Sequence, residues 1–93
     1  MASYEWNESK SRRNRAAHGV AFEEAVSAFA DPLGLIVDDP RHSRDEPRYA
    51  LIAQSERRRT LVVMFTERGD RIRVISARRA TPTERRQYEE ASR

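Results

Sequence analysis

The sequence predicts an α+β domain with two N-terminal helices, a mainly antiparallel sheet of four to five strands, and a C-terminal helix. Three observations carry this prediction. Apolar residues recur at helical spacing within residues 20–30, four segments between residues 33 and 77 are rich in β-branched and aliphatic residues, and a helix-capping pattern begins at residue 81. Separate runs of helices and strands are typical of the α+β class.

The chain opens with Tyr4 and Trp6 on either side of Glu5, an alternation that predicts a short strand. Asn7 is a favoured N-cap for a following polar helix, which Gly19 is well placed to end. The second helix has its apolar face at i, i+3, i+4 and i+7, at Phe22, Ala25, Val26 and Phe29. Asp31-Pro32 ends it, because proline cannot continue a helical ladder.

Four strands are predicted at LGLIVDD (33–39), RYALIAQS (48–55), TLVVMFTE (60–67) and RIRVISA (71–77). The nearly continuous apolar run at 61–65 indicates a central strand buried on both faces. Gly69 next to Asp70 predicts a tight hairpin before the last strand.

Strict alternation in the last strand places Ile72 and Val74 on one face, and Arg71, Arg73 and Ile75 on the other. One face of that strand is therefore expected to be partly basic.

Thr81-Pro82-Thr83-Glu84 has the pattern of a capping box with proline at the first helical position, so residues 82–92 are expected to form a terminal helix. Its apolar content is little more than Tyr88 and Ala91. Such a helix either packs lightly or docks onto a partner.

The chain has 93 residues, which fits a single domain over 1–93. It has no cysteine and no apolar run near the roughly 20 residues that span a bilayer, so we expect a cytoplasmic protein without membrane attachment.

The charge is distributed unevenly along the chain. Residues 1–47 hold six Lys and Arg against nine Asp and Glu, whereas residues 48–93 hold twelve against six. The basic surface therefore belongs to the second half, where every cation is arginine, a side chain suited to bidentate phosphate contact.

Three stretches of the chain together carry a family resemblance: YEWNESKSRRNRAAHGVAFEEAVSAFADP (4–32), DDPRHSRDEPRY (38–49) and LVVMFTERGDRIRVISARRATPTERRQYE (61–89). Their order resembles the BrnT family of toxins from bacterial type II toxin–antitoxin operons. Two positions depart from the family pattern. Ala17 stands where the family often has lysine, and Ala53 where it often has glycine.

The resemblance implies a RelE-like α+β ribonuclease fold and an endoribonuclease that cleaves RNA without a metal ion or other cofactor, inhibiting translation and growth. It also implies neutralisation by a BrnA-like ribbon-helix-helix antitoxin, with the toxin in a dimer or a heterotetramer that the antitoxin bridges.

Metal-free RNA cleavage needs a base for the 2′-hydroxyl proton, an acid for the 5′-oxygen, and cations for the charge on the phosphorane. Histidine titrates near neutral pH, strand arginines are held by the scaffold, and aromatic rings can stack on bases. The candidate catalytic residues are His18, Glu46, Arg48 and Arg78. The candidate RNA-binding residues are Arg68, Arg73, Arg79, His42 and Tyr88.

The catalytic candidates also have structural interpretations. His18 is equally well placed to offset the dipole at the end of the first helix. Glu46 and Arg48 are two residues apart and can form an exposed ion pair of small energetic consequence. For Arg48, Arg78 and Arg79, position and resemblance both favour phosphate contact.

The RNA-binding candidates divide in the same way. A salt bridge near the hairpin fits Arg68 better, solvation in a polar loop fits His42, and core packing fits Tyr88. Two further functions remain open on the sequence alone: a nucleic-acid-binding module without catalysis, and a protein-interaction subunit with a basic docking face.

Overall fold

The computed structural model describes residues 3–39 and 45–91. Its elements are β1 (Ser3–Glu5), α1 (Glu8–His18), α2 (Phe22–Ser27), a 3₁₀ turn η1 (Ala28–Ala30), β2 (Leu35–Asp38), β3 (Arg48–Gln54), β4 (Thr60–Arg68), β5 (Arg71–Arg79) and α3 (Pro82–Ala91). The predicted α+β class is confirmed. Within the described part of the chain, no helix combines the length and the apolar character needed to cross a membrane.

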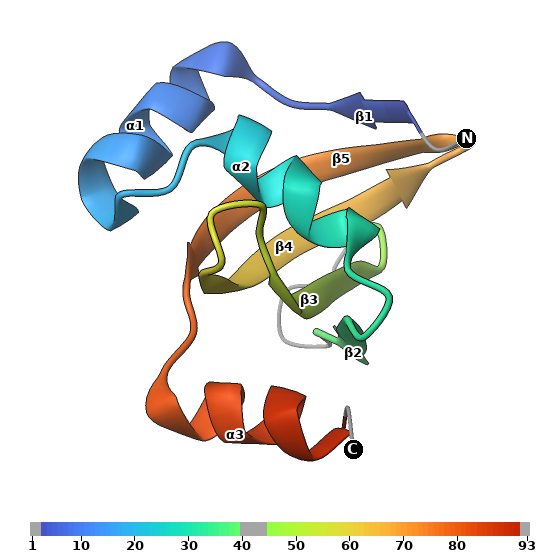
Figure 1. The fold of residues 1–93 in the computed structure, drawn as a ribbon. Coiled ribbons are helices and arrows are strands. Elements are labelled where there is room, and N and C mark those ends of the chain that lie inside the picture. The colour runs from blue at the N-terminus through green and yellow to red at the C-terminus, as the bar shows by residue number, and fades with distance from the viewer. Residues whose placement is uncertain (1–2, 40–44, 92–93) are drawn as a thin grey trace.

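The strands form one five-stranded sheet in the order β1-β5-β4-β3-β2. The consecutive strands β2 to β5 pair antiparallel, and β1 joins the far side of β5 in parallel. Figure 1 shows α1 and α2 over one face of this sheet and α3 beneath the other. Because β1 pairs only with residues 71–73, the remainder of β5 lies beyond β1, where α1 approaches it.

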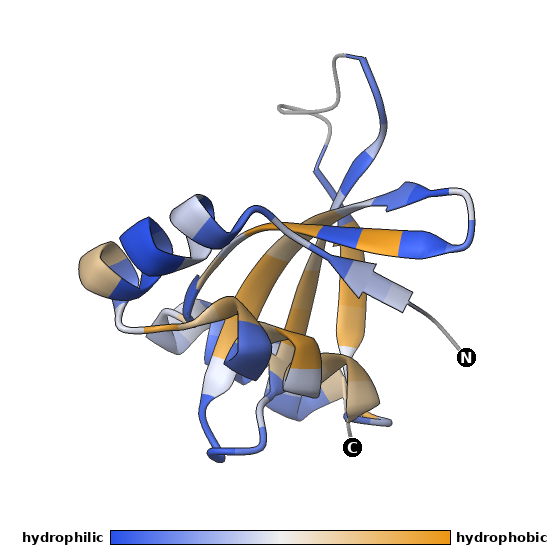
Figure 2. Ribbon diagram, turned by 90° about the horizontal axis from the view of Figure 1, so that it is seen from above, coloured by the Kyte–Doolittle hydropathy of each residue, from blue (hydrophilic) through white to orange (hydrophobic). Residues whose placement is uncertain are grey.

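The main core lies between the sheet and the two N-terminal helices. Phe22 and Val20 are fully buried there against Leu61 and Val63 of the central strand β4 and Val74 of its neighbour β5. Figure 2 shows the apolar residues concentrated in the strands, while the turns are hydrophilic. Burial of these side chains, at about 1.5–3 kcal/mol each, is the main stabilising term of the fold.

A smaller apolar cluster lies on the opposite face, beneath α3. Ile52 and Val62 form its centre, with Met64 half-buried beside them and Tyr88 contributed by α3. The strand β4 is thus buried on both faces over most of its length, as its continuous apolar run predicts.

A β-bulge in β5 alters the alternation expected for that strand. The register shifts between Met64 and Phe65, which pair with Ser76 and Val74, so Ile75 is the extra residue. Ile75 lies against α1, beside His18. The expectation that Ile75 shares a face with Arg71 and Arg73 is therefore wrong, because the inserted residue resets the alternation at this point.

The helix ends follow the sequence signals. The Asn7 side chain accepts a hydrogen bond from the Lys10 N–H (3.1 Å), and Gly19 ends α1 in the left-handed region with φ of 72°. Thr81 and Glu84 form the predicted reciprocal capping box of α3 (2.9 and 3.2 Å).

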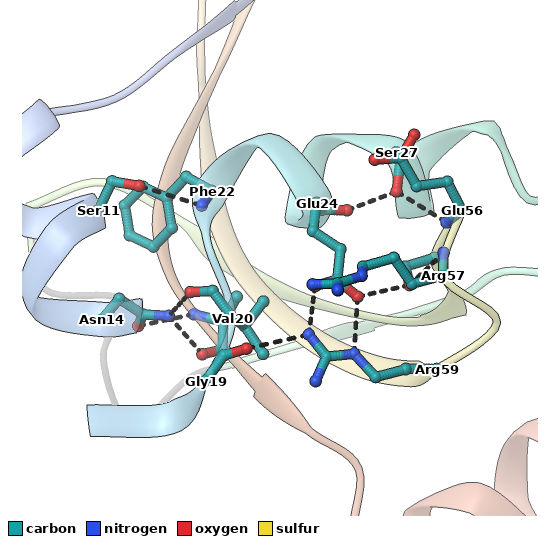
Figure 3. Close-up of polar contacts among 12 residues, drawn as sticks. Ser11, Asn14, Gly19, Val20, Phe22, Glu24, Ser27, Glu56, Arg57 and Arg59 are labelled. Atoms are coloured by element: carbon teal, nitrogen blue, oxygen red, sulfur yellow. Dashed lines mark hydrogen bonds and ion pairs between the residues drawn. The ribbon is translucent and has the colours of Figure 1, made fainter. Parts of the chain in front are cut away.

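Asn14 is a buried polar residue that joins α1 to the sheet. Its side-chain amide donates to the carbonyls of Val20 (2.8 Å) and Ala77 (2.7 Å), and its side-chain oxygen accepts from the Ala77 N–H (3.2 Å). Figure 3 shows Asn14 beside the Gly19–Val20 segment. One side chain thus satisfies backbone groups of β5 and of the link between α1 and α2.

Asn14→Ala should lower the free energy of unfolding by about 2–3 kcal/mol, because it leaves buried backbone groups without partners. Urea unfolding followed by circular dichroism measures the loss. Arg13→Ala, an exposed substitution at the preceding position, is the control; an equal effect of both variants would contradict the role assigned to Asn14.

Candidate functional site

Arginines from two strands share the face of the sheet that carries α3. Arg48, Thr66 and Arg73 form one row across β3, β4 and β5. Thr66 lies on the same face of β4 as Val62, and Val62 pairs with Arg78. Cross-strand partners project to the same side, so we refer to Arg48, Arg73 and Arg78 as the sheet-face arginines. The position of Arg78 lies about 13 Å along the strand from the row, at about 3.3 Å per residue.

Carboxylates lie against two of the sheet-face arginines. Glu5 of β1 pairs with Arg73 at 3.3 Å, and Glu84 of α3 holds Arg78 through two hydrogen bonds of 2.7 and 2.9 Å. These partners offset part of the positive charge and fix the guanidinium groups in place.

Glu46 lies two residues before β3 at the same end of the sheet. The Thr66 hydroxyl donates to the Pro47 carbonyl (2.6 Å), which fixes this approach to the strand. The Glu46 carboxylate accepts a hydrogen bond from Arg68 at 3.2 Å, and this bond raises the pKa of the Arg68 guanidinium. The salt bridge considered for Arg68 is thus present, and it places a carboxylate close to the row that contains Arg48.

The Arg78–Glu84 pair joins the sheet to the start of α3. The hydrogen bonds from Arg78, together with those from Thr81, lower the pKa of Glu84 to about 2. Glu84 therefore has two functions in the structure: it completes the capping box of α3, and it positions the Arg78 side chain.

An open groove of about 660 Å³ runs between the sheet and α3. Its floor is apolar, and charged or polar side chains line its sides. The lining residues are Leu35, Val37, Asp38, Asp39, Ala50, Ile52, Val62, Met64, Arg78, Glu84 and Gln87. The charged side chains in this lining are three carboxylates, Asp38, Asp39 and Glu84, and one guanidinium, Arg78, which is paired with Glu84.

His18 lies on the other side of β5, in the last turn of α1. It is exposed and borders a shallow hollow of about 350 Å³ with Lys10, Arg13, Ala17 and Ile75. Ala17 thus borders the same hollow as His18. The structure does not bring His18 together with Glu46 or the sheet-face arginines.

Arg79 also lies apart from Arg78, because neighbouring residues of a strand point to opposite faces. It lines a pocket of about 310 Å³ with Arg58, Arg59, Thr60 and Arg85, which we call the arginine pocket. Sequence reasoning missed Arg58, Arg59 and Arg85. The arginine run at 57–59 is the signal available in the sequence for two of them, Arg58 and Arg59.

The turn that carries Arg58 and Arg59 is held by Glu24, whose side chain is only 5% exposed. The Glu24 carboxylate accepts hydrogen bonds from the Ser55 hydroxyl (2.7 Å) and from Nε (2.9 Å) and Nη2 of Arg59, as Figure 3 shows in part. Burial alone raises a carboxyl pKa, but the hydrogen bonds from Arg59 and Ser55 outweigh it and lower the pKa of Glu24.

Tyr88 has a structural partner. Its hydroxyl donates to Asp31 at 2.6 Å, and burial together with this carboxylate raises the pKa of Tyr88 to about 12. Stacking of Tyr88 on RNA stays a prediction, as does the role of His42, which lies outside the described residues.

The Arg78–Glu84 pair should make the stability of α3 depend on pH. A carboxyl with a depressed pKa stabilises the fold above its ordinary pKa of about 4.5, and this contribution is lost as the pH falls toward about 2. The difference in free energy of unfolding between wild type and Glu84→Gln should therefore shrink between about pH 6 and about pH 3. Urea titrations at both pH values test this. Glu90→Gln, an exposed change on the same helix, is the control, and a difference that stays constant with pH would contradict the prediction.

Comparison with known proteins adds to this geometry. A family model described as "Ribonuclease toxin, BrnT, of type II toxin-antitoxin system" matches residues 6–84. Among solved structures, the crystal structure of the ribonuclease toxin BrnT from Brucella abortus is similar, with 25% sequence identity and a TM-score of 0.59. The match covers 87% of this chain and 99% of that one. A search of curated proteins finds no match.

The family match extends over residues 6–84, which is most of the chain. The chain therefore belongs to the BrnT family of ribonuclease toxins of type II toxin–antitoxin systems.

Proposed function

We propose that this chain cleaves RNA without a metal ion and that the reacting phosphate binds the α3 side of the sheet. One observation carries the proposal: the bulge at Ile75 brings Arg73 and Arg78 to the same face as Arg48. This arrangement presents three guanidinium groups on one face of the sheet, and Arg78 also lines the groove beside α3. Phosphate groups bind such planar donors, and bases can lie on the apolar surface.

The proposed reaction is an attack of the ribose 2′-oxygen on the adjacent phosphorus. The new bond joins the 2′-oxygen to phosphorus, the bond from phosphorus to the 5′-oxygen breaks, and the products are a 2′,3′-cyclic phosphate and a 5′-hydroxyl. Glu46 takes the 2′-hydroxyl proton, and the leaving 5′-oxygen takes a proton from solvent. Arg48 and Arg73 stabilise the charge on the phosphorane, since guanidinium groups fixed in place need little reorganisation.

Arg78 contacts a phosphate further along the strand in this proposal. His18 borders a hollow with Ile75, whereas Glu46 contacts Arg68 near the hairpin between β4 and β5, so the proposal does not assign the two residues to one phosphate. With the reaction on the sheet face, His18 has no part in the proposed chemical step.

Cleavage of a total-RNA preparation by the purified chain, in the presence of a chelator, tests this proposal. Arg48→Ala, Arg73→Ala and Glu46→Gln should each slow cleavage by about a hundredfold, as expected for the loss of a group that stabilises the transition state. His18→Ala should retain cleavage. Cleavage lost in His18→Ala but kept in Arg48→Ala would move the reacting centre to α1.

Arg78→Ala needs a matched control because it also removes the ion pair to α3. Glu84→Gln breaks that pair and keeps the guanidinium. Loss of cleavage in Arg78→Ala alone points to phosphate contact, whereas equal loss in both variants points to the position of α3. If the wild-type protein leaves RNA intact in the presence of the chelator and cuts it when Mg²⁺ is added, metal independence is refuted.

We further propose that the antitoxin is of the ribbon-helix-helix type and binds the edge strand β2 in a dimeric or heterotetrameric complex. The support is the exposure of three large apolar side chains in or beside this edge strand, Leu33 (52%), Ile36 (58%) and Val37 (41%). Ile36→Glu should weaken capture of the antitoxin encoded beside the toxin while RNA cleavage is unchanged. Equal capture by Ile36→Glu and wild type in a pull-down would contradict this assignment.

A further inference from the structure

The arginine pocket concentrates positive charge away from the sheet face. Arg58 and Arg59 come from the β3–β4 turn, Arg79 from the end of β5, and Arg85 from α3. The Ala80 N–H donates to the Thr60 carbonyl at 2.9 Å, which holds the end of β5 beside this turn. Segments far apart in the sequence thus meet at one small concave site.

Only one of these four arginines has a carboxylate partner within the described residues. Arg59 is paired with Glu24, and its Nη2 also donates to the Gly19 carbonyl at 3.0 Å. The side chains of Arg58, Arg79 and Arg85 have no hydrogen bond or ion pair to any residue that the structure describes. By contrast, Glu5 and Glu84 lie against arginines of the sheet face.

The turn is built to hold its side chains rigidly. The Ser27 hydroxyl accepts from the Glu56 N–H (2.9 Å), and the Ser55 hydroxyl accepts from the Arg57 N–H (3.2 Å) and donates to Glu24. Arg59 uses Nε and Nη2 in these contacts, so the two N–H groups of its Nη1 remain to bind a ligand. A binding group fixed in this way loses little freedom when its ligand arrives.

Arg58 adds an observation of a different kind. Its φ is 61°, the only positive value among the described residues other than glycine. This left-handed conformation favours glycine, and a side chain with a Cβ is disfavoured there. A strained conformation at a long cationic side chain is typical of a position kept for function.

We propose that Arg58, Arg59, Arg79 and Arg85 form a subsite for a phosphate group of the RNA, separate from the reacting phosphate. The proposal rests on the proposed function in taking RNA as the ligand. Phosphate is the chemical class that matches several converging guanidinium groups, since arginine presents paired donors to its oxygens. The phosphate is either an internal diester of the strand, with two non-bridging oxygens, or its terminal 5′-monoester, with three terminal oxygens, and either can accept hydrogen bonds from guanidinium groups.

Binding to RNA that cannot be cleaved separates this subsite from catalysis. The probe is a fluorescent single-stranded oligonucleotide with 2′-O-methyl groups, which lacks the attacking hydroxyl, and anisotropy is measured over a range of salt concentrations. Arg85→Ala should weaken binding about tenfold and make the slope of log affinity against log salt shallower by about 0.7. Arg86→Ala, the next residue of the same helix but not part of the pocket, should bind nearly as wild type does. Repeating the titration with 5′-phosphorylated and 5′-hydroxyl probes distinguishes a terminal from an internal phosphate.

Arg58→Gly gives a second test with two opposite readouts. Glycine relieves the left-handed strain, so the urea midpoint of unfolding should rise, while the loss of the guanidinium should weaken RNA binding. A purely structural role for Arg58 cannot produce both changes together.

If Arg85→Ala, Arg58→Gly and Arg86→Ala all bind the probe with equal affinity, the subsite is overturned, even if RNA cleavage is intact. It is also overturned if the wild-type protein does not bind the probe. A wild type that binds with the predicted differences but never cleaves RNA would overturn the proposed catalysis and leave the subsite standing.

Discussion

The single extra residue at Ile75 is the constraint on which the candidate site depends. Side chains of a regular strand alternate, so Arg73 and Arg78, five positions apart, would project from opposite faces without the bulge. The bulge inverts the alternation between them and delivers both to the face of Arg48. The same inversion keeps Val74 and Ala77 in the main core, so β5 contributes to the core and to the charged face at once.

Two surfaces of this small domain use arginine in different ways. On the sheet face, Arg73 contacts Glu5 and Arg78 contacts Glu84. These carboxylates fix the guanidinium groups and offset part of the positive charge of this face. In the arginine pocket, Glu24 fixes Arg59, and the pocket's other arginines have no carboxylate partner among the residues that the structure describes. The first arrangement suits a reaction that needs defined geometry, and the second suits attraction of a polyanion.

Buried polar side chains connect these surfaces to the core. Asn14 ties α1 to Ala77, immediately before Arg78, and Glu24 ties α2 to the turn that carries Arg58. Within the described residues, no buried side-chain nitrogen or oxygen lacks a partner. In a domain of this size, such satisfied contacts are an economical way to fix the loops, because a lost partner costs about 1–3 kcal/mol.

The sequence by itself determined the α+β class, the order of the elements, the ends of α1 and α3, and the hairpin at Gly69, since these depend on local periodicity and capping. It also identified Arg48, Arg73 and Arg78 as residues to watch. Only the tertiary structure decided which arginines share a face, because a bulge is invisible to a period-two pattern. The tertiary structure also separated His18 from Glu46 and assembled the arginine pocket from residues 58, 59, 79 and 85. Contacts between distant segments are set by packing and not by their spacing in the sequence.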